Sequence, residues 1–190
     1  MPGISSITFP ASASKLAQGP AAVKKALDLI TRSPGNLAAY HGIQIEDSKT
    51  AYFCAIWTGA DAHNAFLKAG THAAFTAALA ELADGPIDAQ YIDVAADPSK
   101  VFDSPVTEGV HFTTKGTDDS AFQAMASNIE SVAPCTWGRS GDNMNHVMFF
   151  VGWESVEAHM AVKDKSEGVL AGARAAAESF KVAHAKLTKA

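Results

Sequence analysis

The chain has 190 residues and a mass of 19.8 kDa, with 47% hydrophobic and 18% charged residues. This composition supplies a sizeable core and excludes a long disordered chain, which would be poorer in apolar residues and richer in charge. The 15 basic and 20 acidic residues give a net charge of −5, and no dense basic stretch occurs, so no nucleic-acid partner is expected. No apolar run approaches the ~20 residues of a membrane span, so no membrane partner is expected either.

The first residues lack the charged region and the apolar region of a secretory signal, which predicts a cytoplasmic location. The two cysteines, Cys54 and Cys135, each lie inside or beside an apolar run. This usage is typical of reduced thiols rather than of a disulfide framework.

In the first half, hydrophobic spacing predicts helices and alternation predicts strands. Val23, Ala26, Leu27 and Ile30 have helical spacing, and Pro34-Gly35 ends that helix. The expected order is a strand over 4–9, a helix over 21–33, strands over 37–45 and 50–57, helices over 61–69 and 72–83, and a strand over 87–94. This β-α-β-β-α-α-β order is close to the ferredoxin-like unit.

The second half repeats this order. Asp118-Asp119-Ser120 opens one helix and Pro134 ends it. The expected elements are a strand over 106–113, a helix over 121–132, strands over 135–139 and 146–153, helices over 155–164 and 168–180, and a strand over 181–187.

A shift of 96 residues aligns 40–91 with 136–187 without a gap. The informative identities are Gly42 with Gly138, Phe53 with Phe149, Trp57 with Trp153, and His63 with His159. Each half therefore contains a buried strand that ends in Trp, a short loop, and a helix that bears Ala-His. The pattern predicts a tandem duplication with repeats over 1–97 and 98–190.

The segment Gly152-Trp153-Glu154-Ser155-Val156-Glu157-Ala158-His159 resembles the dimeric α+β barrel superfamily, in particular its antibiotic-biosynthesis-monooxygenase-like branch. Residues 57–63 are a looser copy. The resemblance implies an α+β fold in which two ferredoxin-like repeats pack sheet to sheet as a pseudo-dimeric barrel. Elementary packing agrees, because the helices of each repeat can cover only one face of its sheet, and a second copy in the chain buries the other.

The candidate site residues are aromatic and proton-carrying side chains. Several side chains of the first repeat that can donate or accept a proton are other residues at the same positions of the second repeat, which favours the first repeat as the active one. Its expected acid–base residues are His63, His41, Tyr52 and His72. The residues expected to line a substrate pocket are Trp57, Phe53, Phe66, Tyr40, Trp153 and His159. For each of them a purely structural place in the core is the alternative.

The sequence contains no HxH, HxxxH or HExxH spacing, so no metal site is expected, and it has no nucleotide-binding glycine motif. The resemblance implies a cofactor-independent monooxygenase or a cyclase that acts on a small apolar, aromatic or polyketide-like molecule. No cofactor is expected. The asparagine of the haem-degrading members is absent from the first strand, while haem binding through a histidine stays open. A non-catalytic ligand-binding or stress-related barrel is the alternative, and pairing into a homo-oligomer is left open.

Overall fold

A computed structural model describes residues 1–11, 13–18, 20–163 and 167–190. The first half comprises β1 (Gly3–Pro10), α1 (Ala13–Gln18), α2 (Pro20–Thr31), β2 (Asn36–Gln44), β3 (Thr50–Trp57), α3 (Ala60–Lys68), α4 (Gly70–Leu82) and β4 (Asp88–Asp93). A short helix, α5 (Ser99–Phe102), leads to the second half. That half comprises β5 (Val106–Thr114), α6 (Ser120–Glu130), β6 (Cys135–Arg139), β7 (His146–Trp153), α7 (Val156–Lys163), α8 (Glu167–Ala176) and β8 (Ala177–Lys189).

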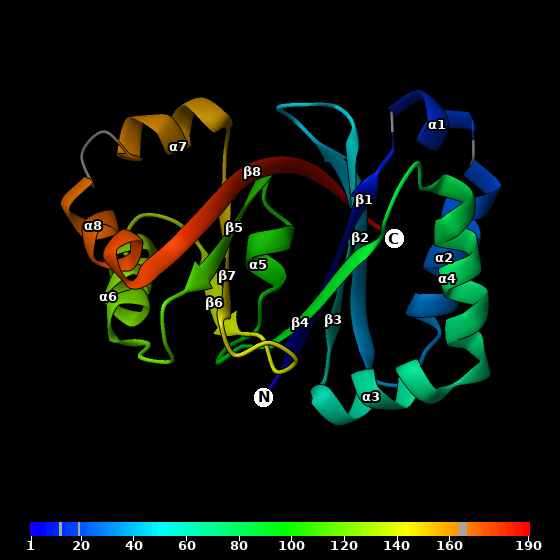
Figure 1. Cartoon of the computed structure of the whole chain (residues 1–190). Helices are drawn as coiled ribbons and strands as arrows, with labels where there is room; N and C mark the ends of the chain where they lie inside the picture. The colour runs from blue at the N-terminus through cyan, green and yellow to red at the C-terminus, as the bar shows by residue number, and fades with distance from the viewer. Residues whose placement is uncertain (12, 19, 164–166) are drawn as a thin grey trace.

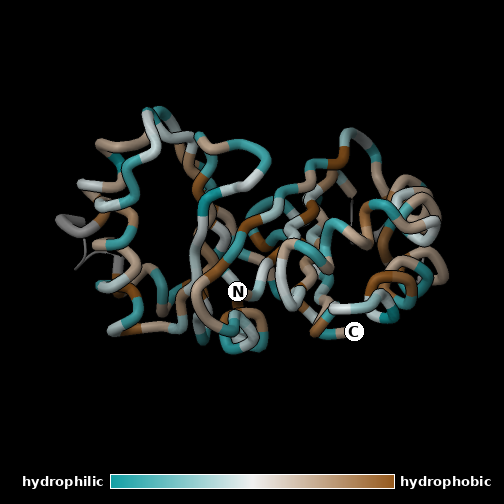
Figure 2. The backbone as a smooth tube through the Cα atoms, turned by 90° about the horizontal axis from the view of Figure 1, so that it is seen from below, coloured by the Kyte–Doolittle hydropathy of each residue, from teal (hydrophilic) through white to brown (hydrophobic). Residues whose placement is uncertain are grey.

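All eight strands form one antiparallel sheet in the order β4-β1-β3-β2-β8-β5-β7-β6. The order within each half is the same, with β5, β6, β7 and β8 in the places of β1, β2, β3 and β4. Figures 1 and 2, which differ by a 90° turn, both place the helices of the two halves on opposite outer sides, with the strands between them. The outer helices carry both hydrophilic and hydrophobic colours in Figure 2, as amphipathic helices do.

Two seams join the halves, and they differ in length. At one seam, β2 pairs with the end of β8, from Tyr40 opposite Lys189 to Gln44 opposite Ala185. At the other, β4 and β6 meet through a single bridge between Ile92 and Ser140. The longer seam exists because β8 continues past its pairing with β5, as the arching strand in Figure 1 shows. The sheet therefore closes almost completely into a barrel.

The core has separate layers on the two faces of the sheet. Phe53, Ala55 and Trp57 of β3 face the helices of the first half, whereas Cys54 and Ile56 face the barrel interior, as strand alternation predicts. The interior layer combines residues of both halves: Ile4, Tyr40, Ile56, Ile92, Phe102, Met148 and Phe150. The predicted packing of two ferredoxin-like repeats sheet to sheet is thus confirmed.

The strands β3, β6 and β7 have the bounds that the sequence predicts. The helix expected over 168–180 is wrong at its end, because α8 stops at Ala176 and β8 begins at Ala177. Tertiary pairing overrides the alanine-rich local pattern here, since the backbone of 177–185 is hydrogen-bonded along β5. The helix expected over 155–164 is α7, and its last residue lies outside the described part of the chain. Of the helices described, none is long and apolar enough to cross a membrane.

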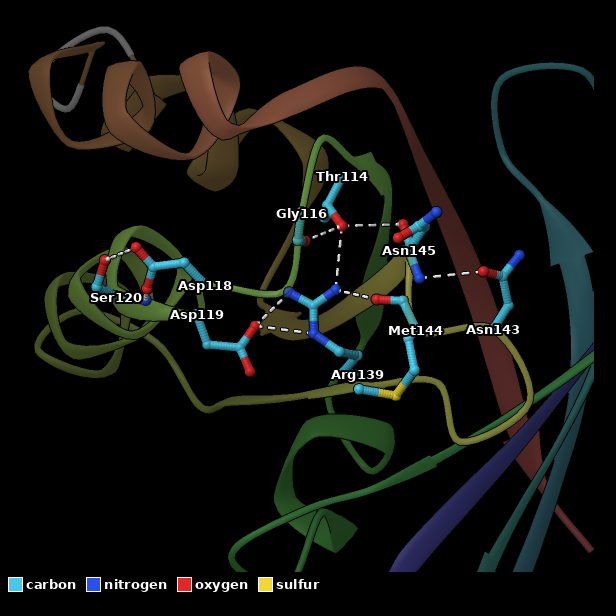
Figure 3. A network of polar contacts seen from close by, with 9 residues as sticks. All are labelled: Thr114, Gly116, Asp118, Asp119, Ser120, Arg139, Asn143, Met144 and Asn145. Carbon is cyan, nitrogen blue, oxygen red and sulfur yellow. Dashed lines mark hydrogen bonds and ion pairs between the residues drawn. The ribbon is translucent and has the colours of Figure 1, made fainter.

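A buried arginine braces one end of the second half (Figure 3). The Arg139 guanidinium donates to Asp119 Oδ1, 3.0 Å from Nε, to Thr114 Oγ1 over 3.0 Å, and to the carbonyl of Met144. Its side chain is only 8% exposed. One side chain therefore ties the end of β5, the start of α6 and the turn between β6 and β7 together.

We expect Arg139→Met to lower the free energy of unfolding by about 1–3 kcal/mol, since charged hydrogen bonds would be lost and acceptors left unsatisfied. Chemical denaturation checks this. The control is Lys24→Met, which breaks the exposed pair with Asp28 on α2 and should change stability by less than about 0.5 kcal/mol. Equal losses in the two variants would contradict a bracing role for Arg139.

Candidate active site

The second repeat contains a cavity of about 400 Å³ between its sheet and α6, α7 and α8. Most of its wall is apolar, with Val110, Met125, Ile129, Val151, Leu170 and Val182 among the lining residues. Glu108, Trp153, His159 and His184 form one polar group in this wall, and Asn128, Ser131 and Arg174 are its other polar lining residues. A largely apolar cavity of this size with a few convergent polar groups is typical of a small-molecule site.

Glu108 is a carboxylate on a buried strand face. Strand alternation places it on the same side of β5 as Val110 and Phe112, facing the helices. Its side chain is 7% exposed, and its Oε2 accepts a hydrogen bond of 2.7 Å from Trp153 Nε1. Burial of a carboxylate is costly unless it is hydrogen-bonded, so the indole N–H helps to keep Glu108 in the apolar wall.

His159 lies on α7, next to the indole ring of Trp153. Its ring stacks on Trp153 with 5.1 Å between centroids. Nε2 of His159 lies 3.7 Å from Glu108 Oε1, and Nδ1 lies 2.8 Å from Nε2 of His184. Both imidazole nitrogens therefore face a polar partner while the ring is held against an aromatic surface.

His184 lies on β8, directly opposite Glu108 in the sheet. Its Nδ1 is 2.5 Å from Oε1 of Glu46, and its backbone N–H donates to both carboxylate oxygens of Glu46 over 3.0 and 3.1 Å. Glu46 belongs to the turn between β2 and β3, in the first repeat. Partial burial would raise the pKa of Glu46, but the hydrogen bonds from His184 outweigh it and hold that pKa below its usual value.

These contacts assign the imidazole tautomers. Because the Glu46 carboxylate accepts the Nδ1–H of His184, Nε2 of a neutral His184 is the acceptor for the Nδ1–H of His159. The lone pair of a neutral His159 is then on Nε2, beside Glu108. The chain Glu46–His184–His159–Glu108 can accept one proton and place the resulting positive charge next to a carboxylate. Glu108, His159 and His184 are also the described residues whose ligand atoms lie close enough to hold a metal ion.

The first repeat has the same arrangement with different chemistry. Sheet register places Ser5 opposite Ala55 and Tyr91, as it places Glu108 opposite Val151 and His184. Ser5 Oγ accepts from Trp57 Nε1 over 3.0 Å, and His63 stacks on Tyr91 with 4.4 Å between centroids. Burial lowers the pKa of His63. A neutral hydroxyl and a phenol thus stand where the second repeat has a carboxylate and an imidazole.

The residues predicted from the sequence are distributed over both faces of the sheet. On the helix side, Trp57, Phe66, His63 and His72 form a chain of ring contacts in the first repeat, while His41 lies beside Phe53 and binds the carbonyl of Thr188. On the interior side, Tyr40 donates to Asp103 and Tyr52 lines a second cavity of about 550 Å³. The four acid–base candidates therefore do not share one cavity wall, and their roles stay predictions. Trp153 and His159 do meet, in the second-repeat cavity.

Sequence reasoning missed Glu46, Glu108 and His184. The shift of 96 is correct for β2 and β3, since Tyr40 opposite Cys54 matches Thr136 opposite Phe150. Beyond the helices the shift is wrong, because Tyr91, which lies opposite Ser5, is equivalent to His184, which lies opposite Glu108, and not to Leu187. One signal was present in the sequence: Glu108 is the acidic residue of β5, and it alternates with the apolar residues Val106, Val110 and Phe112.

A pair of matched substitutions tests whether Glu108 is an ionised group that depends on the indole. Trp153→Phe and Trp57→Phe remove the same bulk and one N–H, but the first takes a hydrogen-bond donor from a buried carboxylate and the second takes one from a hydroxyl. We expect Trp153→Phe to cost about 1–2 kcal/mol more unfolding free energy than Trp57→Phe. Denaturant titration of both variants measures the difference, and equal losses would contradict it.

Comparison with known proteins supports the fold over the whole chain. No protein-family model and no curated protein sequence matches. Among solved structures, a candidate monooxygenase from Fusobacterium nucleatum subsp. nucleatum matches with a TM-score of 0.73 at 14% identity, covering 99% of this chain and 93% of that one. A candidate monooxygenase from Lactobacillus acidophilus matches with a TM-score of 0.69 at 14% identity, over 100% and 95%.

A third structure, of an anthrone oxidase-like protein, matches with a TM-score of 0.73 at 12% identity, over 98% of this chain and 91% of that one. Likeness at such identity establishes architecture and leaves chemistry to the site itself. Because these matches extend over both halves, they confirm the fold that the resemblance implies: two ferredoxin-like repeats in one polypeptide, whose strands form one nearly closed barrel.

Proposed function

We propose that the second-repeat cavity is the active site of a monooxygenase-type enzyme that oxidises a small aromatic molecule with dioxygen. The observation that carries the proposal is the buried Glu108–His159–His184 group in the wall of an apolar cavity of about 400 Å³. The apolar wall holds an aromatic substrate and excludes water, and the imidazole supplies a proton acceptor beside it. The likeness in fold to an anthrone oxidase-like protein supports the choice of substrate class.

The proposed reaction begins with transfer of a proton from the substrate to Nε2 of His159. The imidazolium that forms lies 3.7 Å from the Glu108 carboxylate, and low polarity strengthens this attraction. Glu46 and His184 hold His159 in the tautomer whose Nε2 carries the lone pair that accepts the proton. For anthrone, the carbanion then adds to dioxygen through a new C–O bond, and the peroxide anion takes the proton back from His159. The hydroperoxide loses water, so that one anthrone and one O₂ give one anthraquinone and one water.

Anthrone oxidation provides the test. We expect the protein, treated with EDTA, to consume dioxygen and to form anthraquinone, which an oxygen electrode and absorbance measure together. A cyclase would use the same proton acceptor without consuming dioxygen, and a binding protein would bind anthrone without turnover. Either result, with anthrone bound in the second-repeat cavity, would contradict the proposed oxidation.

His159→Ala should lower kcat/KM for this oxidation by about 10²–10⁴-fold, because it removes the general base. His146→Ala is the control, since His146 lies on the interior side of the sheet, outside this cavity, and should retain activity. His63→Ala compares the repeats directly. Loss of activity in His63→Ala with activity retained in His159→Ala would overturn the assignment to the second repeat and favour the first.

A further inference from the structure

The second-repeat cavity contains a set of metal-ligating side chains as well as a proton acceptor. The ligand atoms of Glu108, His159 and His184 all lie within 4.8 Å of one another. Bonds from first-row metals to such atoms measure about 2.0–2.2 Å, so neighbouring ligand atoms in a metal site lie about 3 Å apart. Nδ1 of His159 and Nε2 of His184 are already 2.8 Å apart. The Glu108 carboxylate lies 3.7 Å from the other nitrogen of His159, Nε2, so side-chain rotations have to bring the three ligands around one ion.

Hydrogen bonds from neighbouring residues already orient two of the three side chains, His184 and Glu108. Glu46 binds Nδ1 of His184, which directs Nε2 of that ring toward His159. A carboxylate behind a ligating imidazole is the usual outer partner in histidine metal sites. Trp153 holds the second oxygen of Glu108 in the same way. Two ligands are thus fixed by hydrogen bonds on their far sides.

Charge also favours a cation at this position. The group contains two carboxylates, Glu46 and Glu108, and two imidazoles that are neutral when each nitrogen lone pair is available. A divalent ion would balance the two negative charges in a region of low polarity. Two imidazoles and one carboxylate suit Fe²⁺, Co²⁺ or Zn²⁺, whereas Mg²⁺ and Ca²⁺ prefer all-oxygen sites.

We propose that Glu108, His159 and His184 bind one divalent first-row transition-metal ion, which replaces the proton between the two imidazoles. Glu108, His159 and His184 line the cavity of about 400 Å³, so an ion held by them would lie at its wall. The inference uses the cavity of the proposed function but not its reaction. Metal binding and anthrone oxidation can therefore fail independently, because the first is measured as Co²⁺ absorbance and the second as dioxygen consumption.

Comparison with the first repeat predicts how many metal ions each chain binds. At the equivalent positions it has Ser5, His63 and Tyr91, which offer one imidazole and no carboxylate. One ion per chain is expected although the fold is duplicated.

Titration of the EDTA-stripped full chain with Co²⁺ tests the proposal, because bound Co²⁺ absorbs in the visible region. We expect saturation at one equivalent per chain and a rise in Tm with Co²⁺. Glu108→Gln and His184→Ala should each abolish the band, and Glu46→Gln should weaken binding by about 10–100-fold. The control His63→Ala should bind one equivalent like the parent protein.

Glu108→Gln is the decisive variant, because glutamine keeps an acceptor for the Trp153 indole and thus preserves the fold, which circular dichroism verifies. No band at millimolar Co²⁺ in the parent protein would overturn the proposal. So would a band that persists in both Glu108→Gln and His184→Ala. Loss in His184→Ala with full retention in Glu108→Gln would assign the ion to imidazoles alone and overturn the three-ligand site.

Discussion

The pairing of β8 with two different strands determines how this molecule is put together. Its first part pairs with β5 within the second repeat, and its last five residues pair with β2 of the first. This continuous strand closes one side of the barrel and buries the interior faces of both sheets against each other. The same strand places His184 between Glu108 of its own repeat and Glu46 of the other. The candidate site therefore depends on the contact that makes the two repeats one domain.

The two repeats show how a duplicated fold can carry different chemistry on one framework. Both keep a strand-ending tryptophan and a histidine on the following helix, and both tryptophans donate to a group on the first strand of the repeat. Two groups next to these residues differ: that acceptor, and the ring on the last strand. In the second repeat these are ionisable, and the neighbouring space is a cavity. In the first, aromatic rings pack closely around the histidine.

The sequence was sufficient for the fold and for half of the candidate site. Alternation and turn residues locate the strands, and the Trp and His pairs reveal the duplication, because these signals are local or occur twice. Glu108, His184 and Glu46 come together only through strand register and through contact between repeats. Helical segments of different length shift that register, so a gapless alignment pairs Tyr91 with the wrong residue. The proton-carrying residues of the first repeat are the obvious candidates in the sequence. In the structure, however, Tyr52 and His63 lie on opposite faces of the sheet.

The turn that carries Glu46 also has an evolutionary consequence. Its counterpart in the second repeat carries Asp142, which is one methylene shorter and exerts its charge on His63. A homodimer of second repeats would thus offer Asp142 to His184, and a homodimer of first repeats would offer Glu46 to Tyr91. Neither ancestral-type assembly reproduces the pairing of Glu46 with His184. The contact between Glu46 and His184 needs one copy of each repeat, so the chain cannot be divided into two equivalent working parts.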